Sequence, residues 1–94
     1  MSLKLIATIT TNETAFEEIK QNALALLAPT RLEDGCLHYE LFQDYETPYT
    51  LIFIEEWRSE EALQKHLSTA HLQAFFKCVE NRAELSLTKA HRLG

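Results

Sequence analysis

An apolar run near the middle of the chain limits the possible folds more than any other feature. Leu51 to Ile54 are four consecutive apolar residues inside a segment, Thr50–Trp57, that has the length and composition of a β-strand. Successive side chains of a strand point to opposite faces, so this run makes both faces apolar. Such a pattern is typical of a strand that is buried on both sides. Both faces of the sheet that holds this segment therefore need a cover.

The length and charge of the chain narrow its class. We expect residues 1–94 to form a single domain, since 94 residues suffice for one compact core. The formal net charge is -5, and the nine Lys and Arg residues are scattered, which argues against nucleic acid and anionic membranes as partners. No apolar run approaches the ~20 residues that span a bilayer, and no signal peptide is evident. We expect a cytoplasmic protein with Cys36 and Cys78 as reduced thiols.

Hydrophobic periodicity predicts six main elements. Strands are expected where apolar residues alternate, and helices where they recur every three or four residues after a capping residue. We expect the first helix to run to about Ala28 and to be ended by Pro29, and Leu37 to share a strand face with Tyr39. The expected strands are 3–10, 36–44, 50–57 and 85–91, and the expected helices begin after Thr11–Thr14 and Ser59, with a fresh start at Thr69.

The order β-α-β-β-α-β is that of the ferredoxin-like α+β fold. Its helices cover one face of a mostly antiparallel sheet and leave the other face open. The doubly apolar strand at Leu51–Ile54 then leaves three or four apolar side chains in water unless a partner covers them. Burial would stabilise each by roughly 1.5–3 kcal/mol. We therefore predict a homodimer that packs sheet against sheet.

The end of this strand carries the first candidate site residues. Glu55 shares a strand face with Phe53 and Trp57, where an unpaired carboxylate is costly to bury, so it either pairs with a cation, reaches solvent or has a raised pKa in a cleft. Trp57 is either a core residue or an aromatic wall for a flat substrate, and Phe53 would line the same pocket. Tyr39 is either a core residue with a hydrogen-bonding tip or a further wall residue.

Two histidines follow on the helical side. In an unbroken helix His66 and His71 would diverge by about 140°, which is poor geometry for a shared metal ion. A break at Ser68–Thr69 would allow both to line one cavity. His66 would then lie near a helix C-terminus and His71 in the first turn of the next helix, so that the two dipoles shift their protonation in opposite directions. The alternative is that each is a partly exposed helix residue or a helix cap.

Two segments resemble motifs of the antibiotic biosynthesis monooxygenase superfamily. Glu33-Asp34-Gly35-Cys36-Leu37-His38-Tyr39 is similar to its E-x-G-C-x-x-Y segment. Glu55-Glu56-Trp57-Arg58-Ser59-Glu60-Glu61-Ala62, followed by His66 and Thr69-Ala70-His71, resembles its E-x-W-x-x-x-x-A-x-x-x-H…T-P-H segment. Ala70 stands where the superfamily usually has proline. The element order matches over nearly the whole chain.

The resemblance implies a dimeric α+β barrel and an enzyme. Superfamily members include cofactor-independent oxygenases of polycyclic phenols, small quinol monooxygenases, haem-degrading enzymes and a relative that processes a phosphorylated autoinducer. The haem-degrading branch needs an asparagine on the first strand and a second tryptophan, where this chain has Ala7 or Thr8 and His66. The histidine pattern is similar to that of the quinol monooxygenases.

We therefore expect an oxygenase that needs no metal or other cofactor and oxidises a quinol or another electron-rich phenol with O₂. His71 would be the catalytic base, and His66 and Glu55 would orient the substrate or move protons. Trp57, Tyr39 and Phe53 would bind the substrate. The alternatives are a non-catalytic module that binds or senses a small ligand, and an isomerase of a small phosphorylated compound of the autoinducer kind.

Overall fold

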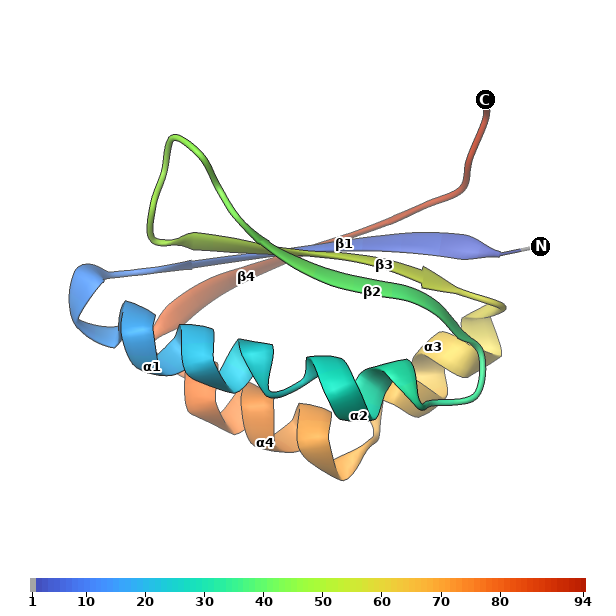
Figure 1. The fold of residues 1–94 in the computed structure, drawn as a ribbon, viewed down its shortest axis with the longest axis horizontal. Coiled ribbons are helices and arrows are strands. Elements are labelled where there is room, and N and C mark those ends of the chain that lie inside the picture. The colour runs from blue at the N-terminus through green and yellow to red at the C-terminus, as the bar shows by residue number, and fades with distance from the viewer. Residues whose placement is uncertain (1) are drawn as a thin grey trace.

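The computed structural model describes residues 2–94 and shows a ferredoxin-like α+β fold, as the sequence predicts. Four antiparallel strands form one sheet in the order β2-β3-β1-β4. All helices lie against one face of this sheet (Figure 1). The elements are β1 (Leu3–Thr11), α1 (Glu13–Leu24), α2 (Leu27–Arg31), β2 (Cys36–Gln43), β3 (Thr50–Trp57), α3 (Glu60–Leu67), α4 (Ala70–Val79) and β4 (Ala83–Ala90).

The core lies between the two central strands and the helices. Alternation places every second residue of β1 and β3 on the helix face, and these residues are almost fully buried. The helices add apolar stripes at three- and four-residue spacing. The buried apolar residues of these elements are Leu5, Ala7, Ile9, Ala15, Phe16, Ile19, Ala23, Leu51, Phe53, Trp57, Ala62, Leu63, Leu72, Phe75 and Val79.

Side-chain caps define the starts of three helices. The side chain of Asn12 accepts the backbone N–H of Ala15 at the start of α1, and Ser59 accepts that of Ala62 at the start of α3. Thr69 does the same at the start of α4. Each cap satisfies an N–H group that has no partner inside its helix.

The first helical segment differs from the expectation. α1 ends at Leu24, and a separate short helix, α2, begins at Leu27 and contains Pro29. The prediction of one helix ended by Pro29 is therefore wrong. Pro29 is the third residue of α2, where a backbone N–H would have no helical acceptor, so proline is tolerated.

Strand β2 also differs from the expected alternation. Cys36 pairs with Trp57 and His38 with Glu56, so one residue of β2, Leu37, has no partner in the register. This irregularity turns Leu37 outward, where it is 48% exposed, and brings Cys36 against the core. Tyr39 keeps its expected inward position and is buried.

No helix formed by the described residues lies on the second face of the sheet (Figure 1). Its central positions are apolar, because the register places Ile6 opposite Ile54, and Ile52 opposite Phe42. The isoleucines are half-buried by their neighbours and Phe42 is 48% exposed. We call these four residues the outer apolar face.

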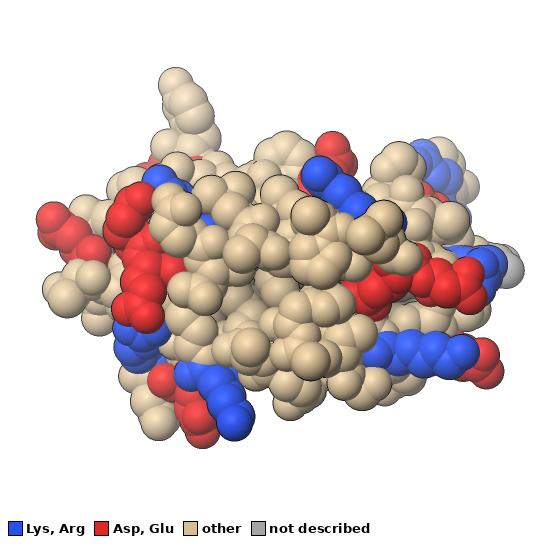
Figure 2. Space-filling model, turned by 60° about the horizontal axis from the view of Figure 1, so that its bottom comes forward, with Lys and Arg blue, Asp and Glu red and all other residues tan. Residues whose placement is uncertain are grey.

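The side of the molecule that bears the helices shows a different surface. Figure 2 shows acidic and basic side chains near the two ends of this side of the molecule, with a broad uncharged band between them and no basic stripe. Among residues 2–94, no helix is long and apolar enough to cross a membrane.

Candidate functional site

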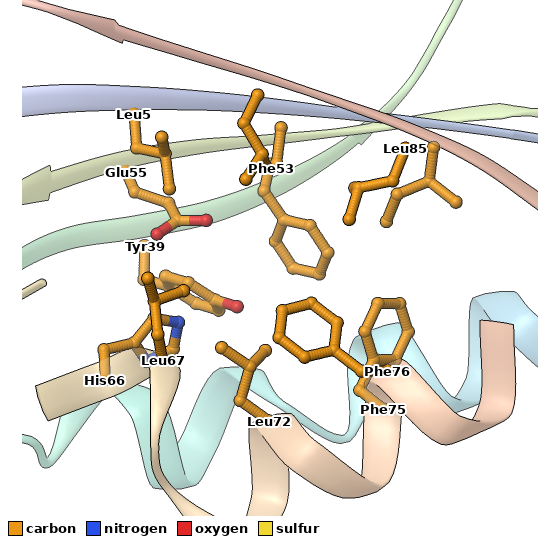
Figure 3. A pocket seen from close by; sticks show the side chains of 13 residues that line it. Leu5, Tyr39, Phe53, Glu55, His66, Leu67, Leu72, Phe75, Phe76 and Leu85 are labelled. Atoms are coloured by element: carbon orange, nitrogen blue, oxygen red, sulfur yellow. The ribbon is translucent and has the colours of Figure 1, made fainter. Parts of the chain in front are cut away.

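A small cavity lies between the helix face of the sheet and helices α3 and α4. Its volume is about 30 Å³, which is room for a water molecule or two. One end is polar, with Glu55, Tyr39 and His66, and the other end is apolar, with Phe75, Phe76 and Leu85 (Figure 3). The lining residues are Leu5, Ala7, Ile9, Tyr39, Phe53, Glu55, His66, Leu67, Leu72, Phe75, Phe76, Leu85 and Leu87.

Aromatic rings form much of the wall. Phe53 on β3 lies between Phe75 of α4, with ring centroids 6.1 Å apart and planes nearly perpendicular, and Tyr39 of β2, with centroids 5.1 Å apart. Edge-to-face and tilted contacts of this kind add to the stabilisation from burial. Burial also raises the pKa of the Tyr39 hydroxyl, so this group is uncharged at neutral pH and can only exchange hydrogen bonds with a ligand.

Among residues 2–94, Glu55 is the only acidic residue on the cavity wall. It lies two residues before Trp57, so both side chains point to the helix face, and the indole Nε1–H of Trp57 donates to Oε1 of Glu55 at 2.8 Å. Burial raises the pKa of Glu55 to about 7, and the hydrogen bond from Trp57 opposes this shift. The carboxyl group can thus serve as either a proton donor or an acceptor near neutral pH.

His66 comes from the last turn of α3 and is only 1% exposed. Its ring lies 4.5 Å from that of Trp57 and 5.5 Å from that of Tyr39, measured between centroids. Burial lowers the pKa of His66, while the carboxylate of Glu33 acts in the opposite direction. The imidazole is therefore largely neutral at neutral pH and has a free ring nitrogen for a proton.

Glu33, in the turn between α2 and β2, joins the two histidines. Its Oε1 and Oε2 lie 3.1 and 3.0 Å from Nδ1 of His66, and Oε2 also lies 2.6 Å from Nε2 of His71. The side chains of Glu33 and His71 are 14% and 28% exposed. The cluster thus runs from the cavity wall at His66 toward the surface at His71.

The same cluster has the composition of a metal site. One ligand atom from each of Glu33, His66 and His71 lies within 4.8 Å of the others, and two histidines with one carboxylate are a common ligand set for zinc and iron. In this structure Nδ1 of His66 and Nε2 of His71 each form a hydrogen bond directly with the carboxylate of Glu33.

Comparison with known proteins places the chain in a family. Residues 2–77 match the model of the family described as antibiotic biosynthesis monooxygenase. The chain belongs to this family. The matched residues contain every element from β1 to α3 and most of α4. They therefore include the cavity residues of these elements and the cluster of Glu33, His66 and His71.

Individual relatives agree with this assignment to the family. "Putative monooxygenase YcnE" of Bacillus subtilis is 36% identical over 59 residues, which are 63% of this chain and 62% of that protein. The chain spans less than two thirds of the length of the curated relatives it matches. The structure of PA3566 from Pseudomonas aeruginosa is 36% identical, covers 99% of this chain and 95% of its own, and has a TM-score of 0.93. That of Rv0793 from Mycobacterium tuberculosis is 25% identical, with coverage of 100% and 97% and a TM-score of 0.93.

The structure brings four of the six residues predicted for the site onto the cavity wall of this family member. They are His66, Glu55, Tyr39 and Phe53. Trp57, expected as a wall, lies behind it instead, where it contacts Glu55 and His66. His71, expected as the base, lies on the far side of Glu33 and does not line the cavity.

The helix break that the sequence predicts is present, but it does not bring both histidines to one cavity. α3 ends at Leu67 and α4 begins at Ala70, and the ring centroids of His66 and His71 are 6.3 Å apart. They approach each other, yet they share a carboxylate and not a cavity. The sequence alone does not single out Glu33 as a site residue, although it is the first residue of the E-x-G-C-x-x-Y segment.

Proposed function

We propose that this protein is a monooxygenase that acts without a cofactor on a small quinol or related electron-rich phenol. The observation that carries the proposal is the pair of titratable groups, Glu55 and His66, at one end of a cavity whose other walls are apolar and aromatic. Membership of the antibiotic biosynthesis monooxygenase family supports the oxygenase class. The hydrophobic walls suit a flat ring, and the polar end suits its hydroxyl group.

The first step assigned to this site is loss of the phenolic proton. Nδ1 of His66 faces Glu33, so the other ring nitrogen, Nε2, is the one available to accept a proton from the substrate. We assign the base to His66, because His71 does not line the cavity. The resulting phenolate is electron-rich enough to transfer electrons to O₂ without metal or flavin.

The overall reaction balances with O₂ as the only co-reactant. A quinol with hydrogen on a ring carbon plus O₂ gives a hydroxyquinone plus water, and a phenol with hydrogen at the para carbon plus O₂ gives a quinone plus water. In both reactions one oxygen atom forms a new bond to the ring carbon, which loses its hydrogen, and the other leaves as water. The O–O bond breaks as the leaving oxygen takes up two protons, which equal in number the hydrogens that the substrate loses overall. Glu55, with its pKa raised to about 7, is suited to protonate the leaving oxygen.

The substrate needs more room than the cavity offers when closed. About 30 Å³ does not hold an aromatic ring, so binding must displace side chains. A surface groove of about 520 Å³ between α4 and β4 shares Phe76 and Leu85 with the cavity. We assign this groove as the entrance, with Phe76 and Leu85 moving aside on binding.

The test is O₂ consumption by the purified protein with a panel of hydroquinones and naphthohydroquinones, in the presence of EDTA. We expect uptake of one O₂ per quinol and a loss of roughly 100-fold or more in kcat for His66→Ala. His91→Ala, which removes an exposed histidine near the C-terminus, is the matched control and should retain full activity.

Two results would contradict the proposal. Equal O₂ consumption by the wild type and His66→Ala would remove the base from the mechanism. Tight binding of a quinol with no O₂ uptake would favour the alternative of a small-ligand binding module.

A further inference from the structure

Glu33, His66 and His71 form a hydrogen-bonded cluster whose role is not explained by the cavity alone. We propose that Glu33 is a positioning residue that holds His66 in its Nδ1–H tautomer and stabilises the imidazolium formed during catalysis, while His71 anchors Glu33 from the solvent side. This inference rests on the proposed function for its catalytic part, whereas its tautomer part can be measured on the resting protein.

The geometry selects the tautomer of His66. An ionised carboxylate only accepts hydrogen bonds, and both oxygens of Glu33 lie within 3.1 Å of Nδ1 of His66. Nδ1 must therefore carry the proton and donate it. Nε2 then keeps its lone pair, and no hydrogen bond from residues 2–94 reaches this atom. A base that lines the cavity needs this arrangement.

The charge of Glu33 matters at the next step. When Nε2 takes the substrate proton, His66 becomes a cation in a site that is 1% exposed, where an unpaired charge is costly. The carboxylate beside Nδ1 compensates this charge, as the aspartate of a Ser-His-Asp triad does for its histidine. Without Glu33, burial alone would make His66 a weak base.

His71 explains how the carboxylate is kept in place. Its Nε2 lies 2.6 Å from Oε2 of Glu33, and its position in the first turn of α4 is set by the cap at Thr69. The side chain of His71 is 28% exposed and does not line the cavity, and its contact with Glu33 is its only side-chain hydrogen bond within residues 2–94.

Backbone hydrogen bonds hold the turn that carries Glu33 in place. The N–H of Glu33 donates to the carbonyl of Thr30, and its own carbonyl accepts the N–H of Cys36. Gly35 follows with φ of 88°, and a Cβ added there would lie 2.5 Å from Cβ of Ala62 in α3. This close approach of turn and helix brings Glu33 within reach of His66.

The deciding experiment is ¹⁵N NMR of the four histidine rings in the wild type, Glu33→Gln and the control Glu46→Gln, whose residue lies in the exposed β2–β3 loop. Single His→Ala variants assign the signals. We expect His66 of the wild type to be the Nδ1–H tautomer. In Glu33→Gln we expect the Nε2–H tautomer to appear and the pKa of His66 to fall, because a favourable negative charge is lost. Glu46→Gln should match the wild type.

Kinetics then separate positioning from a merely structural role. With the quinol that gives O₂ uptake, we expect Glu33→Gln to lower kcat by roughly 100-fold with KM within about threefold, and Glu33→Asp to restore part of kcat. His71→Gln keeps a donor toward Glu33 and should lower kcat by less than about tenfold.

The outcomes distinguish the two proposals. An Nε2–H tautomer of His66 in the wild type would overturn the positioning role, and this measurement does not use Glu33→Gln, so it holds even if that variant fails to fold. Unchanged tautomer and kcat in a folded Glu33→Gln would overturn it as well. The expected tautomers together with no O₂ uptake from any quinol would leave Glu33 as the positioning residue of His66 and instead refute the proposed oxygenase.

Discussion

Glu55 places a carboxyl group at an inward position of β3, between Phe53 and Trp57, where a strand with a helix-covered face normally presents apolar side chains. It is 3% exposed, and its hydrogen-bond partner among the described residues is the indole of Trp57. One neutral donor does not replace the hydration that an ionised carboxylate loses on burial. The residue therefore lowers stability whenever it is ionised, and such a cost at a cavity wall is typical of functional groups.

The first prediction concerns the stability of Glu55→Gln. The pKa of Glu55 is raised from 4.5 to about 7, so the folded state binds this proton more tightly than the unfolded state. The wild type should lose stability relative to Glu55→Gln as pH rises from about 4.5 to about 7, by about 3 kcal/mol in total. Urea unfolding of both proteins at pH 4.5 and pH 8 measures the difference. A difference that does not change between these pH values would show that folding does not raise the pKa of Glu55.

The second prediction follows from the partner of Glu55. Trp57→Phe removes the Nε1–H donor, which stabilises the ionised carboxylate, so the pKa of Glu55 should rise above that of the wild type. We also expect a loss of about 1–3 kcal/mol in unfolding free energy, because a buried acceptor loses its donor. Carboxyl ¹³C NMR titration follows the pKa directly, and Phe76→Leu at the other end of the cavity serves as a control that should leave this pKa unchanged.

At the scale of elements, the interruption between α3 and α4 arranges the site. Ser68 and Thr69 leave the helical path after Leu67, and the hydroxyl of Thr69 donates to the carbonyl of His66 at 2.8 Å while it accepts the N–H of Leu72 at 3.4 Å. A continuous helix would point His66 and His71 apart by about 140°. The break turns α4 so that His71 meets the carboxylate that His66 also contacts.

A pair of cap variants tests this arrangement. Thr69→Ala and Ser59→Ala each remove one N-cap side chain, so each should lower the unfolding free energy by about 1 kcal/mol. Only Thr69→Ala also removes the hydrogen bond from the residue-69 side chain to the carbonyl of His66, which links the last turn of α3 to the start of α4. We expect it alone to change the NMR signals of His71 and to weaken its contact with Glu33. Equal effects of the two variants on the His71 signals would show that the cap at Thr69 has no role in the site.

The parts of the molecule that are local in sequence could be predicted, and those that depend on long-range contacts could not. Alternation and capping residues suffice for the order of strands and helices along the chain and for the break at Thr69, because both depend on neighbouring residues. The two helices around Pro29 depend on which turn of a helix holds the proline, and the unpaired Leu37 depends on the register with β3. Neither is visible in a periodic pattern.

The site follows the same rule. Glu55 and Trp57 lie two residues apart on one strand, so their shared face could be predicted. Glu33 is 33 residues from His66 and 38 from His71, in a turn whose polar residues have no periodicity. Its role emerges only when the turn is packed against α3.

At the scale of the whole molecule, the outer apolar face is the main surface that lacks a cover. Ile6, Phe42, Ile52 and Ile54 form one contiguous patch across the three strands β1, β3 and β2, and no helix of residues 2–94 covers it (Figure 1). The core of the protomer does not require this pattern, since the helix face alone supplies the buried residues. Water contact with such a patch is unfavourable, and a symmetric partner can cover it with the identical patch of a second chain.

We therefore predict that the protein is a homodimer in solution, with the two sheets packed through the outer apolar face. Ile52→Glu places a carboxylate at the centre of that face in both protomers, where charge repulsion and desolvation should weaken dimerisation by about 100-fold or more. Leu32→Glu adds the same charge at a residue that is 87% exposed beside α2, and it should leave the dimer intact. Sedimentation velocity across a micromolar concentration series measures both. A wild type that remains monomeric throughout, or an Ile52→Glu variant that sediments like the wild type, would mean that something other than a second copy of the sheet covers this face.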